Sequence, residues 1–166
     1  HNRVRRQRQM CIRDSCVAVE KIYSIKKRNI KTPMLSLVKN HTMIQNFSDT
    51  PPNIINDILD SLIESTTVIY PNGKNLCKHI LSEDKSIGFR IPNNKFCLEL
   101  ISLINKPIVS TSANIHREAF PKSFSEINNH ILKQVDYVVN LPRDNWSTKP
   151  SSVIKIDEFG NFRKIR

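Results

Sequence analysis

Pro107-Ile-Val-Ser-Thr-Ser-Ala-Asn114 joins an apolar run to a cluster of small polar residues, and it decides the fold that the sequence predicts. Ile108–Ser110 has the pattern of a short strand, and Ser110-Thr-Ser-Ala-Asn114 lies at its exit. In open α/β sheets, ligands bind at the carboxyl ends of strands. Small residues there let hydroxyl and backbone N–H groups reach a phosphate or a carboxylate. An ordinary Ser/Asn-rich turn is the alternative interpretation.

On either side of this segment, apolar patterns of helical and strand spacing alternate. The pattern predicts helices over residues 17–27, 54–63, 76–81, 96–103 and 123–133, the last opened by a capping box at Ser123 and Glu126. It predicts strands over residues 34–38, 66–70, 86–91, 108–110, 137–141, 152–156 and 162–166, with the last two forming a hairpin. Such alternation indicates an α/β domain with a mixed or parallel sheet flanked by helices.

The basic character of the chain is unevenly distributed. The formal net charge is +11 over 166 residues, and residues 1–15 supply +4 of it through five arginines against Asp14. We interpret residues 1–15 as a non-native or disordered leader and residues 16–166 as the domain. A nucleic-acid-binding tail is the alternative interpretation of this leader. The remaining +7 suits a partner rich in phosphate, either a nucleotide or RNA.

Several function classes are disfavoured by composition. No apolar run approaches the roughly 20 residues that span a bilayer, and no leader of the secretory type is present, so we expect a cytoplasmic protein. The four cysteines lack C-x-x-C spacing, so we expect reduced thiols and no metal site. The three glycines form neither a P-loop nor a dinucleotide fingerprint. Side-chain cations and hydroxyls would therefore have to bind any nucleotide.

Lys26 and Arg28 lie at the predicted end of the first helix. Residues two apart on a helix point to nearly opposite sides, so these cations can converge on one ligand only if the helix ends between them. Asn29 and the nearby Pro33 favour such an end. A solvated basic helix end that complements the helix dipole is the alternative interpretation.

Two further segments carry candidate anion-binding groups. Arg90 lies in an otherwise apolar strand, where a buried guanidinium is costly unless it is paired. It therefore either meets an anion or lies on an open face of the sheet. Ser151 and Ser152 open a later strand, where a hydroxyl holds a phosphate or finishes a turn.

Together and in this order, these segments resemble the YrdC-like family of threonylcarbamoyl-adenylate synthases, over about residues 17–166. The markers are Ile22-Tyr-Ser-Ile-Lys-Lys-Arg28, Gly88-Phe-Arg-Ile-Pro92, Pro107-Ile-Val-Ser-Thr-Ser-Ala-Asn114, Pro150-Ser-Ser-Val153 and Ile165-Arg166. The Lys-x-Arg and Ser-x-Asn signatures of the family fall on Lys26, Arg28, Ser112 and Asn114. Thr66-Thr-Val-Ile-Tyr70 and Ser82-Glu-Asp-Lys-Ser-Ile-Gly88 resemble the branch found in Bacteroidota-type bacteria.

The resemblance implies a twisted α/β sheet with an open, basic, concave face. It also implies a reaction in which L-threonine and bicarbonate form a carbamate that attacks the α-phosphate of ATP. The products are threonylcarbamoyl-AMP and pyrophosphate, and a partner transferase complex then modifies tRNA. Mg²⁺ is expected to accompany the triphosphate, without clear protein ligands. This chemistry needs fixed cations and oriented hydroxyls rather than a protein nucleophile.

The resemblance also implies a role for each matching position. Lys26, Arg28, Ser112 and Asn114 are the expected catalytic residues, and Arg90 and Ser110 the expected threonine-binding residues. The expected ATP ligands are Lys26, Arg28, Thr32, Ser112, Asn114, Ser151 and Arg166.

The sequence also departs from the family pattern. The first strand of the family and its Thr-rich motif are absent where residues 1–15 stand, so we expect an N-terminally incomplete domain. Phe120 occupies a usual hydroxyl position. A non-catalytic module of the same fold that binds double-stranded RNA or tRNA is the alternative function.

Overall fold

The computed structural model describes residues 15–50, 66–140 and 152–165. Residues 1–32 and 111–150 form one compact unit, and residues 33–110 and 151–166 form a second. The predicted helix over residues 54–63 and the loop over residues 142–150 lie outside the described residues.

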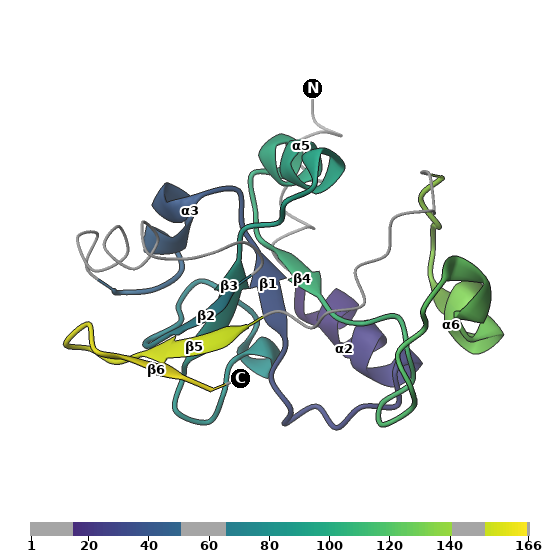
Figure 1. The fold of residues 1–166 in the computed structure, drawn as a ribbon, viewed down its shortest axis with the longest axis horizontal. Coiled ribbons are helices and arrows are strands. Elements are labelled where there is room, and N and C mark those ends of the chain that lie inside the picture. The colour runs from purple at the N-terminus through teal and green to yellow at the C-terminus, as the bar shows by residue number, and fades with distance from the viewer. Residues whose placement is uncertain (1–14, 51–65, 141–151, 166) are drawn as a thin grey trace. The chain divides into compact units, whose positions relative to one another are not determined.

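The described part of the second unit contains a six-stranded sheet of order β4-β1-β3-β2-β5-β6 (Figure 1). The strands are β1 (Leu35–Leu37), β2 (Thr67–Tyr70), β3 (Ile87–Arg90), β4 (Ile108–Ser110), β5 (Val153–Ile156) and β6 (Phe162–Lys164). The pairs β1–β3 and β2–β5 are parallel, whereas the other three pairs are antiparallel. The predicted α/β class with a mixed sheet is therefore confirmed.

Burial along β3 alternates from residue to residue. Ile87 and Phe89 are each 1% exposed, whereas Gly88 and Arg90 on the opposite face are half-buried. Val68 and Tyr70 of β2 pair with Phe89 and Ile87 and are buried with them, and the rings of Tyr70 and Phe89 lie 5.9 Å apart. Because side chains alternate along a strand, one face of β3 packs into the core and the other is only half-buried.

Short helices connect the strands, and asparagines mark their ends. The side chain of Asn40 accepts from Met43 N at 3.0 Å and caps α3 (His41–Gln45), a helix that the sequence did not predict. Asn94 caps α5 (Lys95–Ile104) in the same way, and the left-handed Asn105 ends it. A 3-10 turn, η1 (Lys78–Ile80), replaces the predicted helix over residues 76–81. Asparagine favours both positions because its short amide bonds to nearby backbone.

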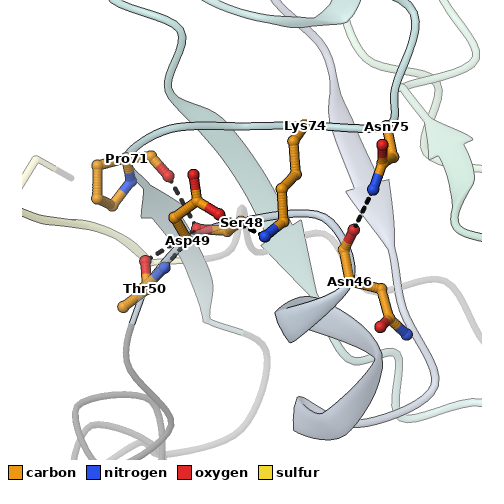
Figure 2. Close-up of polar contacts among 7 residues, drawn as sticks. All are labelled: Asn46, Ser48, Asp49, Thr50, Pro71, Lys74 and Asn75. Carbon is orange, nitrogen blue, oxygen red and sulfur yellow. Dashed lines mark hydrogen bonds and ion pairs between the residues drawn. The ribbon is translucent and has the colours of Figure 1, made fainter.

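Polar contacts attach the loop after α3 to the turn after β2 (Figure 2). Ser48, only 1% exposed, donates through Oγ to the carbonyl of Pro71 at 2.8 Å. Its Oγ accepts in turn from Thr50 Oγ1 at 2.9 Å. At the rim, Lys74 pairs with Asp49, and Asn75 Nδ2 donates to Asn46 O at 3.0 Å. The buried hydroxyls thus satisfy each other while fixing the loop.

The first unit is mainly helical. It contains α2 (Ser15–Ile25), η2 (Phe124–Glu126) and α6 (Asn129–Gln134). Ile25, Ile115 and Ile131 form a buried cluster, against which Ile127 and Val135 pack. Lys21 Nζ also pairs with Asp136 Oδ1 at 2.6 Å. None of the helices among the described residues has the length and apolar character that crossing a bilayer requires.

Three expectations from the sequence are wrong in whole or in part. The predicted helix over residues 123–133 is divided, because Ser123 makes no cap hydrogen bond and pairs its Oγ with Ser125 Oγ. Glu126 accepts from Lys122 N instead. Residues 137–140, expected as a strand, have no strand pairing. Among the cysteines, Cys97 is a free thiol as expected, whereas Cys16 and Cys77 are each disulfide-bonded.

Acid titration tests the contacts of Asp84, which join β5 to the turn before β3. Hydrogen bonds from Lys155 Nζ at 2.5 Å and from Ser86 lower the pKa of Asp84 from 3.8 to about 2. A carboxylate with a lowered pKa stabilises the fold above about pH 3.8, and this stabilisation disappears as the pH falls towards 2.

We expect Asp84→Asn to cost about 1 kcal/mol at pH 6, a modest amount because the side chain is half-exposed. The difference from the unsubstituted chain should shrink below about pH 4 in urea unfolding curves. Glu83→Gln, an exposed neighbour, is the matched control. A difference that is independent of pH would contradict this role.

Candidate functional site

Helix α2 ends at Ile25, two residues before the predicted end of residues 17–27, so Lys26 and Arg28 both follow its last residue. Lys27 adopts a left-handed conformation, with φ of 49°. Lys27 N donates to Ser24 O and Arg28 N to Tyr23 O, each at 3.0 Å. These two bonds form a Schellman motif, which satisfies the last carbonyls of a helix and turns the chain away from its axis. Because the chain turns here, Arg28 no longer follows the direction of the helix axis.

The ammonium of Lys26 is buried and bound to the segment after β4. It is 4% exposed, donates to the carbonyl of Ser112, and donates to the carbonyl of Asn114 at 2.6 Å. Asn114 Oδ1 is a third acceptor at 3.4 Å. The Lys26 carbonyl also accepts from His116 N at 2.9 Å. One residue therefore holds this segment through both its side chain and its backbone.

Ser112 and Asn114 complete the network. Ser112 Oγ donates to Asn114 Oδ1 at 2.5 Å, and Asn114 Nδ2 donates to Glu118 O at 2.7 Å. Asn114 is 8% exposed, whereas Ser112 is exposed. The structure thus brings together three of the four predicted catalytic residues, with a hydroxyl at the surface of the group.

Charge is concentrated around this network. Burial, and then the nearby Arg28 guanidinium, lower the pKa of Lys26 from 10.5 to about 8. Lys26 is still mainly protonated at pH 7, and the carbonyl oxygens that accept from it favour the same charged form. The charges of Lys26 and Arg28 thus act on each other and make the surroundings of this network electropositive.

Tyr23 is a residue whose role the sequence analysis missed. Its side chain is 3% exposed, and its hydroxyl donates to Thr32 O at 2.7 Å. Burial raises its pKa, although the Arg28 charge acts in the opposite direction. Tyr23 therefore remains a donor near neutral pH and holds the segment from Arg28 to Thr32. Its place on the last turn of α2, three residues before Lys26, was the available signal.

Arg90 and Ser110 share one face of the sheet in the second unit. Leu35 of β1 pairs with Ser110 on one side and with Gly88 on the other, and Arg90 follows Gly88 by two residues. Arg90 is half-buried, and burial lowers its pKa. No acidic side chain of the described ranges lies within ion-pair distance of it. Arg90 thus lies on the face of β3 opposite Ile87 and Phe89.

The remaining predicted residues are less informative. Thr32 is half-buried and engages Tyr23 through its backbone carbonyl. Phe120 is 70% exposed. Ser151 and Arg166 lie outside the described residues.

Comparison with protein families identifies the chain. The Sua5/YciO/YrdC family model, described as "Telomere recombination", matches residues 10–166, which include both signatures and the whole described sheet. The chain belongs to the Sua5/YciO/YrdC family. The resemblance inferred from the motifs is therefore confirmed.

Two relatives of the chain are named as synthases. A putative threonylcarbamoyl-AMP synthase of Methanocaldococcus jannaschii is 33% identical over 141 residues, which cover 85% of this chain and 65% of that protein. A threonylcarbamoyl-AMP synthase of Pseudoalteromonas translucida is 27% identical over 146 residues, covering 86% of this chain and 78% of that protein. The chain thus spans about two thirds of the length of the first relative.

A solved structure agrees with the fold. Sua5 of P. abyssi complexed with L-threonine superposes with a TM-score of 0.73 over 84% of this chain and 41% of that chain, at 19% identity. At this identity, the match supports the six-stranded mixed sheet and its helices.

Substituting Lys26 tests whether the buried ammonium holds the segment after β4. We expect Lys26→Met to destabilise the fold by about 2 kcal/mol, because the carbonyls of Ser112 and Asn114 lose their donor. The amide of His116 should also exchange faster with solvent. Urea unfolding and hydrogen exchange measure both effects, with the exposed Lys31→Met as the control. Unchanged exchange at His116 would contradict the bridging role.

A substitution at the left-handed Lys27 should raise the stability, in contrast to Lys26→Met. Glycine adopts positive φ without the Cβ conflict of other residues, so Lys27→Gly should stabilise the fold by up to about 1 kcal/mol. Lys31→Gly, outside the left-handed positions, serves as the control in the same thermal unfolding measurement. A loss of stability for Lys27→Gly would show that its side chain matters more than its backbone.

Proposed function

We propose that this chain forms L-threonylcarbamoyladenylate and pyrophosphate from L-threonine, bicarbonate and ATP, for threonylcarbamoyladenosine modification of tRNA. The observation that carries the proposal is the Lys26 ammonium, which joins the Lys-x-Arg signature to the Ser-x-Asn signature. The synthase names of the relatives support the same reaction. The product would pass to a transferase complex that acts on tRNA in the cytoplasm.

The reaction requires stabilisation of negative charge. A carbamate anion must approach the α-phosphate of ATP while negative charge moves onto the leaving pyrophosphate. Fixed cations and oriented donors stabilise that charge, and they cost no reorganisation during the reaction. In this proposal Arg28 and Ser112 contact the phosphates, while Lys26 and Asn114 hold the segment that carries Ser112 and add positive charge. ATP would enter with Mg²⁺ bound to its phosphates.

The other assignments complete the proposal. Thr32, Ser151 and Arg166 are further ATP ligands. Arg90 binds the threonine carboxylate, because a planar guanidinium can donate two parallel hydrogen bonds to it, and Ser110 contributes a hydroxyl on the same face of the sheet. The lowered pKa and half-buried position of Arg90 favour an anionic ligand, which would offset the cost of its burial. The P. abyssi Sua5 complexed with L-threonine supports the choice of amino acid.

Pyrophosphate release tests the proposal. We expect release from ATP that requires both L-threonine and bicarbonate, measured in the full-length protein. Arg28→Ala and Asn114→Ala should each lower kcat/KM by 100-fold or more, on the order of removing one preorganised charge-stabilising donor. Lys122→Ala, an exposed cation of the same unit, should leave the rate unchanged.

Two outcomes would overturn the proposal. One is an absence of threonine-dependent pyrophosphate release, and the other is full activity in both Arg28→Ala and Asn114→Ala. Salt-dependent binding of double-stranded RNA without pyrophosphate release would instead support the non-catalytic module.

A further inference from the structure

The structure explains why glycine occupies two of its three positions in the sequence. Gly160 has φ of 87°, a conformation that side chains rarely adopt. A Cβ on Gly73 would lie 2.7 Å from Leu81 Cδ2 and 3.1 Å from Lys85 O, so a larger residue would require these neighbours to shift. The turn geometry and the local packing therefore account for both.

Neither a positive φ nor tight packing explains Gly88. It lies in the strand β3, between β1 and β2 (Figure 1), and its φ is not positive. A Cβ built on it would lie 3.4 Å from Thr67 Cγ2 and 3.5 Å from Leu35 Cβ, which are ordinary van der Waals contacts. The fold therefore has room for a Cβ atom at this position. Glycine weakens a strand, so its presence here needs another explanation.

A glycine inside a strand often marks a place where a ligand approaches the backbone closely. The surroundings of Gly88 favour this explanation. Gly88 lies on the half-buried face of β3, with Ser110 on the same face of the sheet one strand beyond Leu35. Arg90 is two residues further along the same face of β3, and its half-buried guanidinium meets no carboxylate of the described residues.

The spacing fits a small ligand. Residues two apart on a strand are separated by about 6.6 Å, so a ligand that spans from Arg90 to Gly88 needs only a few carbon atoms. A carboxylate is the group that a guanidinium binds in bidentate fashion. A small α-amino acid has both properties.

We propose that Gly88 is a specificity-determining residue, which leaves room on the sheet for the body of a small amino acid whose carboxylate Arg90 binds. The inference rests on the proposed function and adds a residue to it. A methyl or isopropyl group at position 88 would occupy the space of the amino acid, whereas the residues assigned to the phosphates, Arg28 and Ser112, belong to the other unit. The substitution should therefore weaken binding of the amino acid alone.

Gly88→Ala and Gly88→Val test this inference by steady-state pyrophosphate release in the full-length protein. We expect KM for L-threonine to rise several-fold in Gly88→Ala and by roughly 10-fold or more in Gly88→Val, a range typical of a few misplaced carbon atoms in a substrate pocket. KM for ATP should change less than about twofold, because the substitution leaves the phosphate contacts intact. Calorimetry with L-threonine alone should show the same loss of affinity.

Stability measurements separate this role from a structural one. Gly88→Ala should keep or raise the melting temperature, because the Cβ has room and alanine restricts the unfolded chain. Gly160→Ala is the matched control: it should lower the melting temperature through its φ of 87° and leave both KM values unchanged. An unchanged KM for L-threonine in Gly88→Val, or an equal rise in both KM values, would overturn the role of Gly88. An inactive unsubstituted protein would instead contradict the proposed function itself.

Discussion

The candidate site depends on the hydrogen bonds of the buried Lys26 ammonium. Burying a charge is costly unless hydrogen bonds replace its hydration, and here the carbonyls of Ser112 and Asn114 supply them. These partners lie 86 and 88 residues away along the chain. Neither end can move without exposing unpaired polar groups, so the helix end and the segment after β4 hold each other in place.

A second constraint comes from the alternation of side chains in the sheet. Ile87 and Phe89 are buried in the core, which necessarily directs Arg90 to the opposite face. The same alternation places Ser110 on the face of Arg90, through the register of Leu35 with both neighbouring strands. A guanidinium can therefore remain inside an apolar strand, because only one face of that strand belongs to the core. The strand geometry itself separates the packed face from the face that carries Arg90 and Ser110.

The residue types of the site match the chemistry of an adenylate-forming reaction. Joining two anionic reactants requires positive charge and rigid donors rather than a nucleophile. In the first unit, Lys26 and Arg28 supply charge, Ser112 supplies a hydroxyl, and Tyr23 fixes the segment that leads to Thr32. Hydrogen bonds hold Lys26, Ser112 and Tyr23 in place. Such preorganisation is the main means by which a site without a glycine-rich loop can stabilise phosphate charge.

The sequence alone determined the fold class, the strand Ile108–Ser110 and a helix that ends near Lys26, since apolar periodicity and turn residues are local signals. The local pattern gave a wrong prediction where other residues formed the hydrogen bonds: Ser123 and Glu126 form a capping-box pattern, yet Ser125 and Lys122 bond to them. Only the tertiary structure decided that the Lys26 ammonium binds the carbonyls near Asn114, and that Gly88 has room for a Cβ atom. Both depend on residues distant in sequence, which no local pattern records.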